Sequence, residues 1–263
     1  MIKDLPNFTG SRRDAAVALG VELIRDIPAD FALTEIQERV RQAVVSGKPW
    51  QSPDLCQALA TANKPMYYLD FETWSPALPA YPGTRPFQAL PFQFSLHIED
   101  SDGATEHVEF LHEDRSDPRR RLAGALLQAV GDSGSIVVYS SFEKTTVTGL
   151  ARDLPDLAEP LMALVDRLWD LHPVIRNHYY HPGFRGSFSI KGVLPAMLPG
   201  EGWANLKISG GGDAGLFYER GLSASDPETR EREFKALLDY CRQDSWAMVR
   251  LVQELRRLCA GAA

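Results

Sequence analysis

The sequence predicts an α/β protein in which helices flank a mixed sheet, with a small helical segment at the start of the chain. Three observations favour this class. Three short stretches with the apolar patterns of strands lie close together within residues 66–111, and an amphipathic helical pattern follows at 117–130. A fourth apolar stretch comes next, and after residue 143 the pattern is mainly helical.

Composition excludes several classes of protein. The chain has 263 residues and a formal net charge of −7, with 44% hydrophobic and 24% charged residues, which excludes a disordered or low-complexity protein. No apolar run approaches the ~20 residues of a membrane span, and no signal segment is recognisable. Because the chain is acidic, nucleic acid could bind only at a local basic surface or through bound cations.

The three cysteines, Cys56, Cys241 and Cys259, are far apart in the sequence. This spacing predicts neither a disulfide framework nor a Cys-x-x-Cys half-site for zinc. A reducing cytoplasm is therefore the expected location.

Residues 1–64 are predicted to form a helical N-terminal lead, and residues 65–263 the main domain. Ser11 is expected to cap a first helix. Thr34 and Gln37 form the capping-box pattern of a second helix. The favoured interpretation of the lead is a packing appendage.

The strands of the main domain can be placed in order. Residues 66–69 form a buried strand that ends at Asp70, residues 92–98 alternate as a half-buried strand does, and residues 108–110 suggest a third strand. Residues 136–139 are continuously apolar, as in a central parallel strand. A right-handed crossover through the helix would place this fourth strand parallel to its neighbour. The order predicts a ribonuclease-H-like fold.

Asp70 and Glu72 stand out because acids at the end of an apolar strand need a reason. Strand residues two apart point to the same face, so both carboxylates can face one site while Phe71 packs on the other side. Two close carboxylates repel each other unless a cation such as Mg²⁺ or Mn²⁺ binds them. A second Asp-x-Glu triplet, at residues 226–228, is better explained as a helix N-terminus.

Three further acids are candidates for the same site. Glu143 follows the strand at 136–139 and lies either beside the first pair or at a helix N-terminus, where it would stabilise the dipole. Tyr240 and Asp244 share one face of the last helix, at the edge of its apolar stripe, where an acid needs a metal or an arginine as partner. Asp170 is expected to be a helix N-cap in preference to a fifth carboxylate at the metals.

These motifs resemble, in type and order, those of the DEDD (DnaQ-like) 3′–5′ exonucleases, whose fold is ribonuclease-H-like. A bacterial family, the domain of unknown function 2779, is more similar. The segments that carry this resemblance are Tyr68–Thr73, Tyr81–Pro86, Pro91–Ser95, Gly186–Lys191 and Val193–Pro195. The resemblance extends over roughly residues 66–255.

The resemblance implies two divalent cations, Mg²⁺ or Mn²⁺, held by Asp70, Glu72, Glu143 and Asp244. Asp70 would bridge both cations, Glu72 and Asp244 would complete the site that activates water, and Glu143 would support it. Tyr240 would orient the attacking water. The second motif departs from the superfamily pattern, which usually has Asp at the position of Glu143.

Residues 171–200 contain no Asp or Glu and interleave basic with aromatic side chains, which predicts contact with phosphates and stacking on bases. The alternative is a loop and helix whose aromatic residues form a core. The candidate substrate-binding residues are Arg176, Tyr179, Tyr180, Arg185 and Lys191.

The expected function is that of a metal-dependent nuclease, a hydrolase acting as a 3′–5′ exonuclease on single-stranded DNA or RNA. Two alternatives remain at this point: a structure-selective endonuclease, and a nucleic-acid-binding or scaffold module with a weakened metal site. Larger members of the family join this module to a RecB-like nuclease, so such a nuclease is a candidate partner. No association with membranes is expected.

Overall fold

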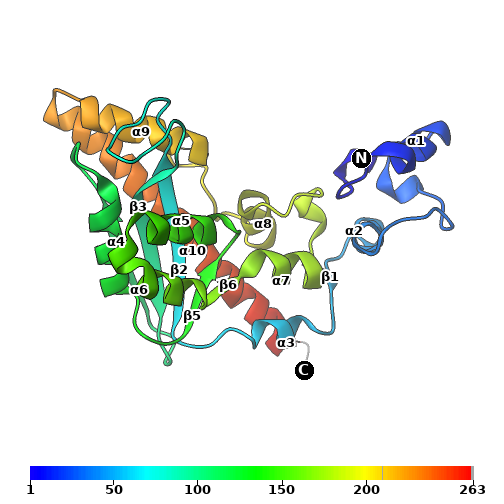
Figure 1. Cartoon of the computed structure of the whole chain (residues 1–263). Coiled ribbons are helices and arrows are strands. Elements are labelled where there is room, and N and C mark those ends of the chain that lie inside the picture. The colour runs from blue at the N-terminus through cyan, green and yellow to red at the C-terminus, as the bar shows by residue number, and fades with distance from the viewer. Residues whose placement is uncertain (209, 262–263) are drawn as a thin grey trace. The chain divides into compact units, whose positions relative to one another are not determined.

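The computed structural model describes residues 1–208 and 210–261, which form two compact units (Figure 1). The sheet unit consists of residues 62–171 and 202–250. The accessory unit consists of residues 1–61, 172–201 and those from 251 onwards. This division differs from the predicted one, because two segments distant in sequence pack with the N-terminal lead.

The sheet unit contains a five-stranded mixed sheet of order β4-β3-β2-β5-β6. Its strands are β2 (Met66–Trp74), β3 (Leu90–Glu99), β4 (Thr105–Leu111), β5 (Ser135–Val138) and β6 (Leu168–Asp170). The first three strands pair antiparallel, whereas β5 is parallel to both β2 and β6. This topology confirms the ribonuclease-H-like prediction, to which the structure adds the short strand β6.

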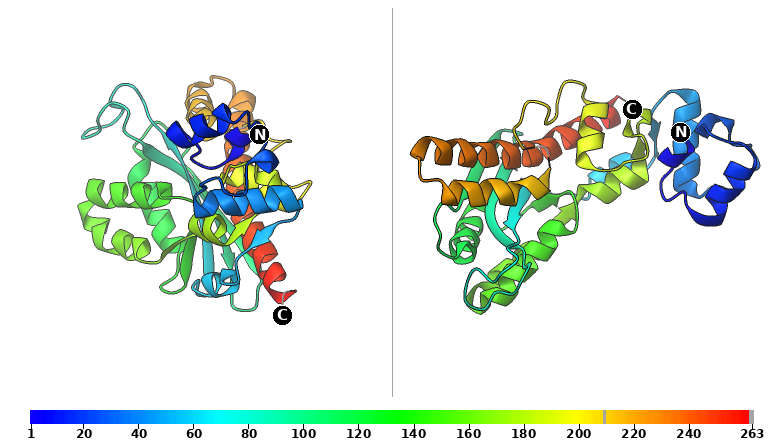
Figure 2. Two further views of the ribbon diagram at one scale, coloured as in Figure 1. Left: turned by 90° about the vertical axis from the view of Figure 1, so that its right-hand side faces the viewer. Right: turned by 90° about the horizontal axis from the view of Figure 1, so that it is seen from above.

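Helices cover both faces of this sheet (Figure 2, right). One face carries an apolar core, to which Tyr67, Leu69 and Phe71 of β2 contribute. The other face packs against the middle of the chain's longest helix, around Leu237 and Ser245. The helices of the sheet unit are α4 (Pro118–Ala129), α5 (Phe142–Asp153), α6 (Ala158–Val165), α9 (Gly211–Ser223) and α10 (Pro227–Ala260), whose last residues belong to the accessory unit.

The accessory unit is mainly helical. The predicted capping box is confirmed at α2: the Thr34 hydroxyl accepts a hydrogen bond from the backbone of Gln37, whose side chain accepts one from the backbone of Thr34. The predicted cap at Ser11 is wrong, because α1 follows Thr9. The elements are α1 (Gly10–Ala18), α2 (Glu35–Ser46), β1 (Trp50–Gln51), α3 (Leu55–Leu59), α7 (Leu171–His178, whose first residue belongs to the sheet unit), β7 (Tyr179–Tyr180), α8 (Ile190–Met197) and short 3₁₀ turns at Ile2–Asp4, Ile24–Asp26 and Pro182–Phe184.

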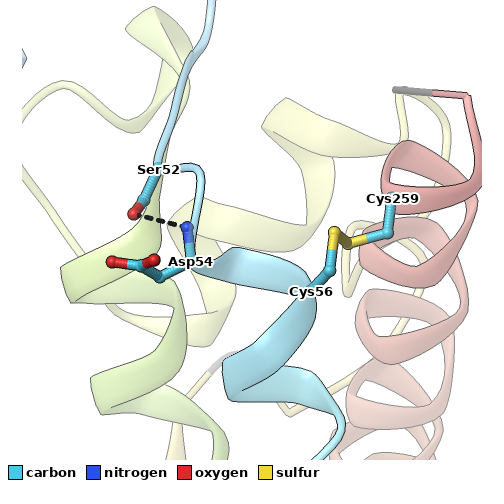
Figure 3. Close-up of a disulfide and its surroundings, with 4 residues drawn as sticks. All are labelled: Ser52, Asp54, Cys56 and Cys259. Atoms are coloured by element: carbon cyan, nitrogen blue, oxygen red, sulfur yellow. Dashed lines mark hydrogen bonds between the residues drawn. A yellow bond between two sulfur atoms is a disulfide. The ribbon is translucent and has the colours of Figure 1, made fainter. Parts of the chain in front are cut away.

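A disulfide joins Cys56 of α3 to Cys259 in the last turn of α10 (Figure 3). The prediction that the cysteines form no disulfide is therefore wrong. Their separation of 203 residues leaves no local signal of the pairing. The bridge also removes the argument for a reducing compartment, because disulfides persist in oxidising ones. Among the described residues, no helix has both the length and the apolar character needed to cross a membrane.

Candidate metal centre

Strand β2 places Asp70 and Glu72 on the face of the sheet that packs against α10, as the sequence predicts. Register shows this directly: Asp70 lies opposite Ser95 of β3, and Ser95 bonds to Ser245 of α10 at 2.7 Å between the two hydroxyl oxygens. Phe71 packs into the core on the other face. The alternation of strand side chains is the cause of this division.

Helix α10 is fixed on this face by buried polar contacts. The side-chain amide of Gln93 donates to the carbonyl of Leu237 at 2.9 Å, and His97 Nδ1 lies 2.9 Å from the Ser245 hydroxyl. Ser245 has no exposed surface and directly follows Asp244. These contacts set the rotation and height of α10, and so they determine where Asp244 lies.

The carboxylates of Asp70, Glu72 and Asp244 converge. One oxygen from each lies within 4.8 Å of the others, and Glu72 and Asp244 are buried. Three oxygen donors at this separation suit a hard divalent cation, which takes several carboxylate ligands. The residues therefore fit the predicted metal.

The electrostatics of the cluster also favour a bound cation. Burial raises the pKa of Asp70 well above its ordinary value, and the neighbouring charges of Asp244, Glu72 and Glu143 raise it further. Desolvation and mutual repulsion both make the charged form of these carboxylates unfavourable. A bound divalent cation would relieve both effects.

Glu143 and Asp170 lie at the ends of adjacent parallel strands. Glu143 is in the first turn of α5, just after β5, and is buried; the Ser140 hydroxyl donates to its carboxylate at 3.4 Å. Burial raises the pKa of Glu143 to about 7, and the charges of Asp170 and Asp244 contribute to the rise. Glu143 is thus beside the three-carboxylate cluster without being one of its closely spaced members.

Asp170 lies immediately before a helix, as the sequence predicted, because α7 begins at Leu171. It is also the last residue of β6, paired in register with Val138. Its charge acts on Glu143 and on Tyr139. A metal-binding role for Asp170 stays a prediction.

Tyr240 is buried beside the cluster, and its side chain is hydrogen-bonded to that of Asp244, one helical turn further on. Burial, followed by the charges of Asp244, Glu72 and Asp70, raises the pKa of Tyr240 far above its ordinary value. The phenol therefore stays protonated at neutral pH and acts as a hydrogen-bonding group.

Sequence reasoning missed Cys241 as a residue of the site. Its thiol is fully buried and donates to the Asp70 carboxylate at 3.3 Å and to the Asp70 carbonyl oxygen at 3.6 Å. Its place three residues before Asp244, between helical neighbours that face the carboxylates, was the available signal.

The predicted substrate-binding residues belong to the accessory unit. Tyr179 and Tyr180 form β7 and are buried, with Tyr180 packing edge-on against Phe184 and Phe188. Their burial favours the alternative that these aromatic residues form a core, and it does not support stacking of bases on the two rings. Arg176 lies in α7, Lys191 in α8, and Arg185 follows a short turn in left-handed conformation.

A cavity of about 840 Å³ opens in the sheet unit where β2 ends. Its wall begins at Thr73, the residue after Glu72, and continues along the following loop to Ala80; α9 forms the opposite wall with Gly211, Gly212 and Gly215. The glycines leave space because they present no side chain. The cavity is large enough for a nucleotide-sized ligand, and its lining does not include Asp70, Glu72 or Asp244.

The topology and the acidic cluster define an α/β protein of the ribonuclease-H-like class with a candidate metal centre. Residues 67–189 match the profile of a family described as "Domain of unknown function (DUF2779)", which confirms the predicted resemblance to that family over this range. The range includes the first two motifs and leaves out Tyr240 and Asp244, which the fold brings to the site. The curated proteins and the solved structures gave no match.

We expect His97 to make the protein less stable in acid. Burial lowers the pKa of His97 to about 3 from an ordinary 6.5, and the charges of His107 and Arg242 lower it further. Between these pH values the unfolded chain binds a proton that the folded chain does not bind, so stability falls by about 1.4 kcal/mol per pH unit below 6.5.

Urea unfolding at pH 7 and pH 5, with a chelator present, would measure this effect. Protonation of His97 in the unfolded chain should lower the free energy of unfolding by about 2 kcal/mol between pH 7 and pH 5. The variant His97→Asn, which keeps an amide near Nδ1, should lose correspondingly less. Equal losses in the two proteins would contradict the assignment to His97.

Proposed function

We propose that this protein is a metal-dependent nuclease that hydrolyses phosphodiester bonds of single-stranded nucleic acid as a 3′–5′ exonuclease. The observation that carries the proposal is the convergence of Asp70, Glu72 and Asp244, from β2 and α10, within 4.8 Å of one another. The order of these motifs along the chain and the ribonuclease-H-like topology support it. The direction of cleavage rests on the resemblance to the DEDD exonucleases.

Asp70, Glu72 and Asp244 would hold divalent cations, with Glu143 beside them. Bound Mg²⁺ or Mn²⁺ would supply Lewis-acid stabilisation of the charge that develops in phosphodiester hydrolysis, and two such ions could serve the attacking and leaving oxygens. Retention of all these acids at one place argues against a module whose metal site has decayed.

The chain's own groups would prepare the attack. The Tyr240 phenol, held by its bond to Asp244, can accept a hydrogen bond from a water molecule and so orient it. Tyr240 is not a general base at neutral pH because its pKa is raised. The Cys241 thiol fixes the carboxylate of Asp70 in one orientation through the bond at 3.3 Å.

The test uses single-stranded DNA and RNA labelled at the 5′ end, incubated with Mn²⁺, Mg²⁺ or a chelator. Wild type should give a metal-dependent ladder that shortens from the 3′ end, and Asp70→Asn should give none. Glu228→Gln, in the second Asp-x-Glu triplet at the start of α10, is the matched control and should cleave as wild type does.

The other outcomes decide between the alternatives. Discrete internal fragments would identify an endonuclease. Absence of cleavage together with Mn²⁺ binding would indicate that activity needs a partner, such as a RecB-like nuclease. Absence of both cleavage and metal binding would replace the proposal with a scaffold module.

A further inference from the structure

A second, smaller cavity in the sheet unit combines features that suit a nucleic-acid strand. Its volume is about 190 Å³, and it lies between the loop before β3 and helix α5. The side chains that matter for the argument are Arg85, Phe87, Arg119, Phe142, Arg152 and Asp153. We call this set the arginine–aromatic cavity.

Two aromatic rings at this cavity are exposed to solvent. Phe87 is 71% exposed and Phe142 is 40% exposed, whereas most other phenylalanine side chains of the chain are buried. Phe87 also has a left-handed backbone, with φ of 56°, and its amide donates to the carbonyl of Pro76 at 2.8 Å. A bulky residue held in this conformation with its ring in water costs free energy without contributing to a core, which points to a role in binding.

The charge of the cavity is opposite to that of the whole chain. Three arginines and one aspartate line it; with Asp117, which is paired with Arg119, the local charge is +1, whereas the protein carries −7. Arg119 is buried and paired with Asp117 and Asp153. Within residues 1–208 and 210–261, Arg152, which is 60% exposed, forms one ion pair, with Asp153, and Arg85 forms none. Arg85 and Arg152 can therefore contact phosphates.

The cavity shares helix α5 with Glu143, which lies beside the carboxylate cluster. Phe142 immediately precedes Glu143 in the first turn of α5. At the other end of this helix, Asp153 accepts hydrogen bonds from Gln88 at 2.7 Å and from Arg119 at 2.8 Å, which tie the Phe87 loop to α5. A strand bound in the cavity would thus continue toward Glu143.

We infer that the arginine–aromatic cavity binds single-stranded nucleic acid, with bases stacked on Phe87 and Phe142 and phosphates on Arg85 and Arg152. This inference rests on the proposed function for its relevance to cleavage. Base stacking is thereby assigned to the exposed rings of Phe87 and Phe142, and no longer to the buried rings of Tyr179 and Tyr180. The local positive charge also explains how an acidic protein could bind a polyanion. Exposed bases are required, because stacking needs a free face.

The test measures binding, without cleavage, by fluorescence anisotropy in the presence of a chelator. The probes are a labelled oligothymidylate and an abasic oligomer of the same length. Phe87→Ala and Phe142→Ala should each weaken oligothymidylate binding about 5- to 150-fold and leave the abasic oligomer unaffected. The double variant Arg85→Ala/Arg152→Ala should weaken both and reduce the salt slope by about 1.4, the value for two lost phosphate contacts.

Arg120→Ala is the control for loss of charge. Arg120 is also exposed and paired with one aspartate, Asp156, and it does not line the cavity. It should bind both probes as wild type does. Equal binding by the control and the cavity variants, or no binding of oligothymidylate by wild type, would overturn the inference.

Hydrolysis of bis(p-nitrophenyl) phosphate with Mn²⁺, measured in parallel, separates this inference from the proposed function. That small diester needs the carboxylates and not the cavity. Oligothymidylate binding that depends on the cavity, with no hydrolysis of the small diester, would support the inference while contradicting the nuclease. Hydrolysis of the small diester without cavity-dependent binding of oligothymidylate would support the nuclease and contradict the inference.

Discussion

Asp70→Asn is expected to abolish the response of the protein to metal while raising the stability of the metal-free form. In the folded protein the charge of Asp70 is disfavoured by burial and by Asp244 and Glu72, so a neutral amide removes an unfavourable term. The same change removes a central ligand. Each kcal/mol gained should raise the melting temperature by about 2–4 °C.

Thermal unfolding with and without Mn²⁺ would measure both effects. Wild type should melt higher as Mn²⁺ is added, because a ligand that binds only the folded state stabilises it. The melting temperature of Asp70→Asn should be higher than that of wild type without metal and should not increase when Mn²⁺ is added. Its cleavage rate should fall about 10³-fold, which corresponds to several kcal/mol of lost charge stabilisation.

Glu228→Gln is again the matched control, since it removes a carboxylate from the other Asp-x-Glu triplet. It should retain the shift with Mn²⁺. A Mn²⁺-dependent shift that survives in Asp70→Asn would show that the cation binds elsewhere, and a lower melting temperature of that variant without metal would contradict the electrostatic argument.

The second large effect is expected from the disulfide between Cys56 and Cys259. Closing a loop of 203 residues restricts the unfolded chain, and the loop-entropy relation gives up to about 5 kcal/mol of stabilisation. Measured values for disulfides are often smaller, so we expect a loss of about 2–5 kcal/mol when the bridge is removed. The melting temperature should fall by about 4–20 °C.

The double variant Cys56→Ser/Cys259→Ser and a reducing agent should produce the same decrease. Wild type should respond to the reducing agent, and the double variant should not. Labelling of the unreduced protein after unfolding should find one free thiol, that of Cys241. Three free thiols, or an unchanged melting temperature after reduction, would contradict the prediction.

Local patterns determined much of the fold. Alternating apolar residues identified β3, continuous apolar residues identified β5, and the period of two placed Asp70 and Glu72 on one face with Phe71 on the other. Thr34 and Gln37 predicted their own capping box. These predictions succeed because each depends on residues within one or two turns of each other.

Only the tertiary structure decided which distant groups meet. Strand β6 has three residues, too few for a period, and exists because β5 offers it a parallel edge; this made Asp170 a strand residue. The Cys56–Cys259 bridge, the burial of Tyr179 and the exposure of Phe87 likewise depend on packing between segments far apart in sequence.

The sequence by itself therefore determined the class of fold, the face on which each strand acid lies and the types of residue that could bind a metal. The tertiary structure decided that Asp70, Glu72 and Asp244 lie within 4.8 Å and that Cys241 contacts Asp70. The physical reason is that backbone geometry repeats over a few residues and can be inferred locally, whereas the approach of α10 to β2 depends on the packing of the whole sheet unit.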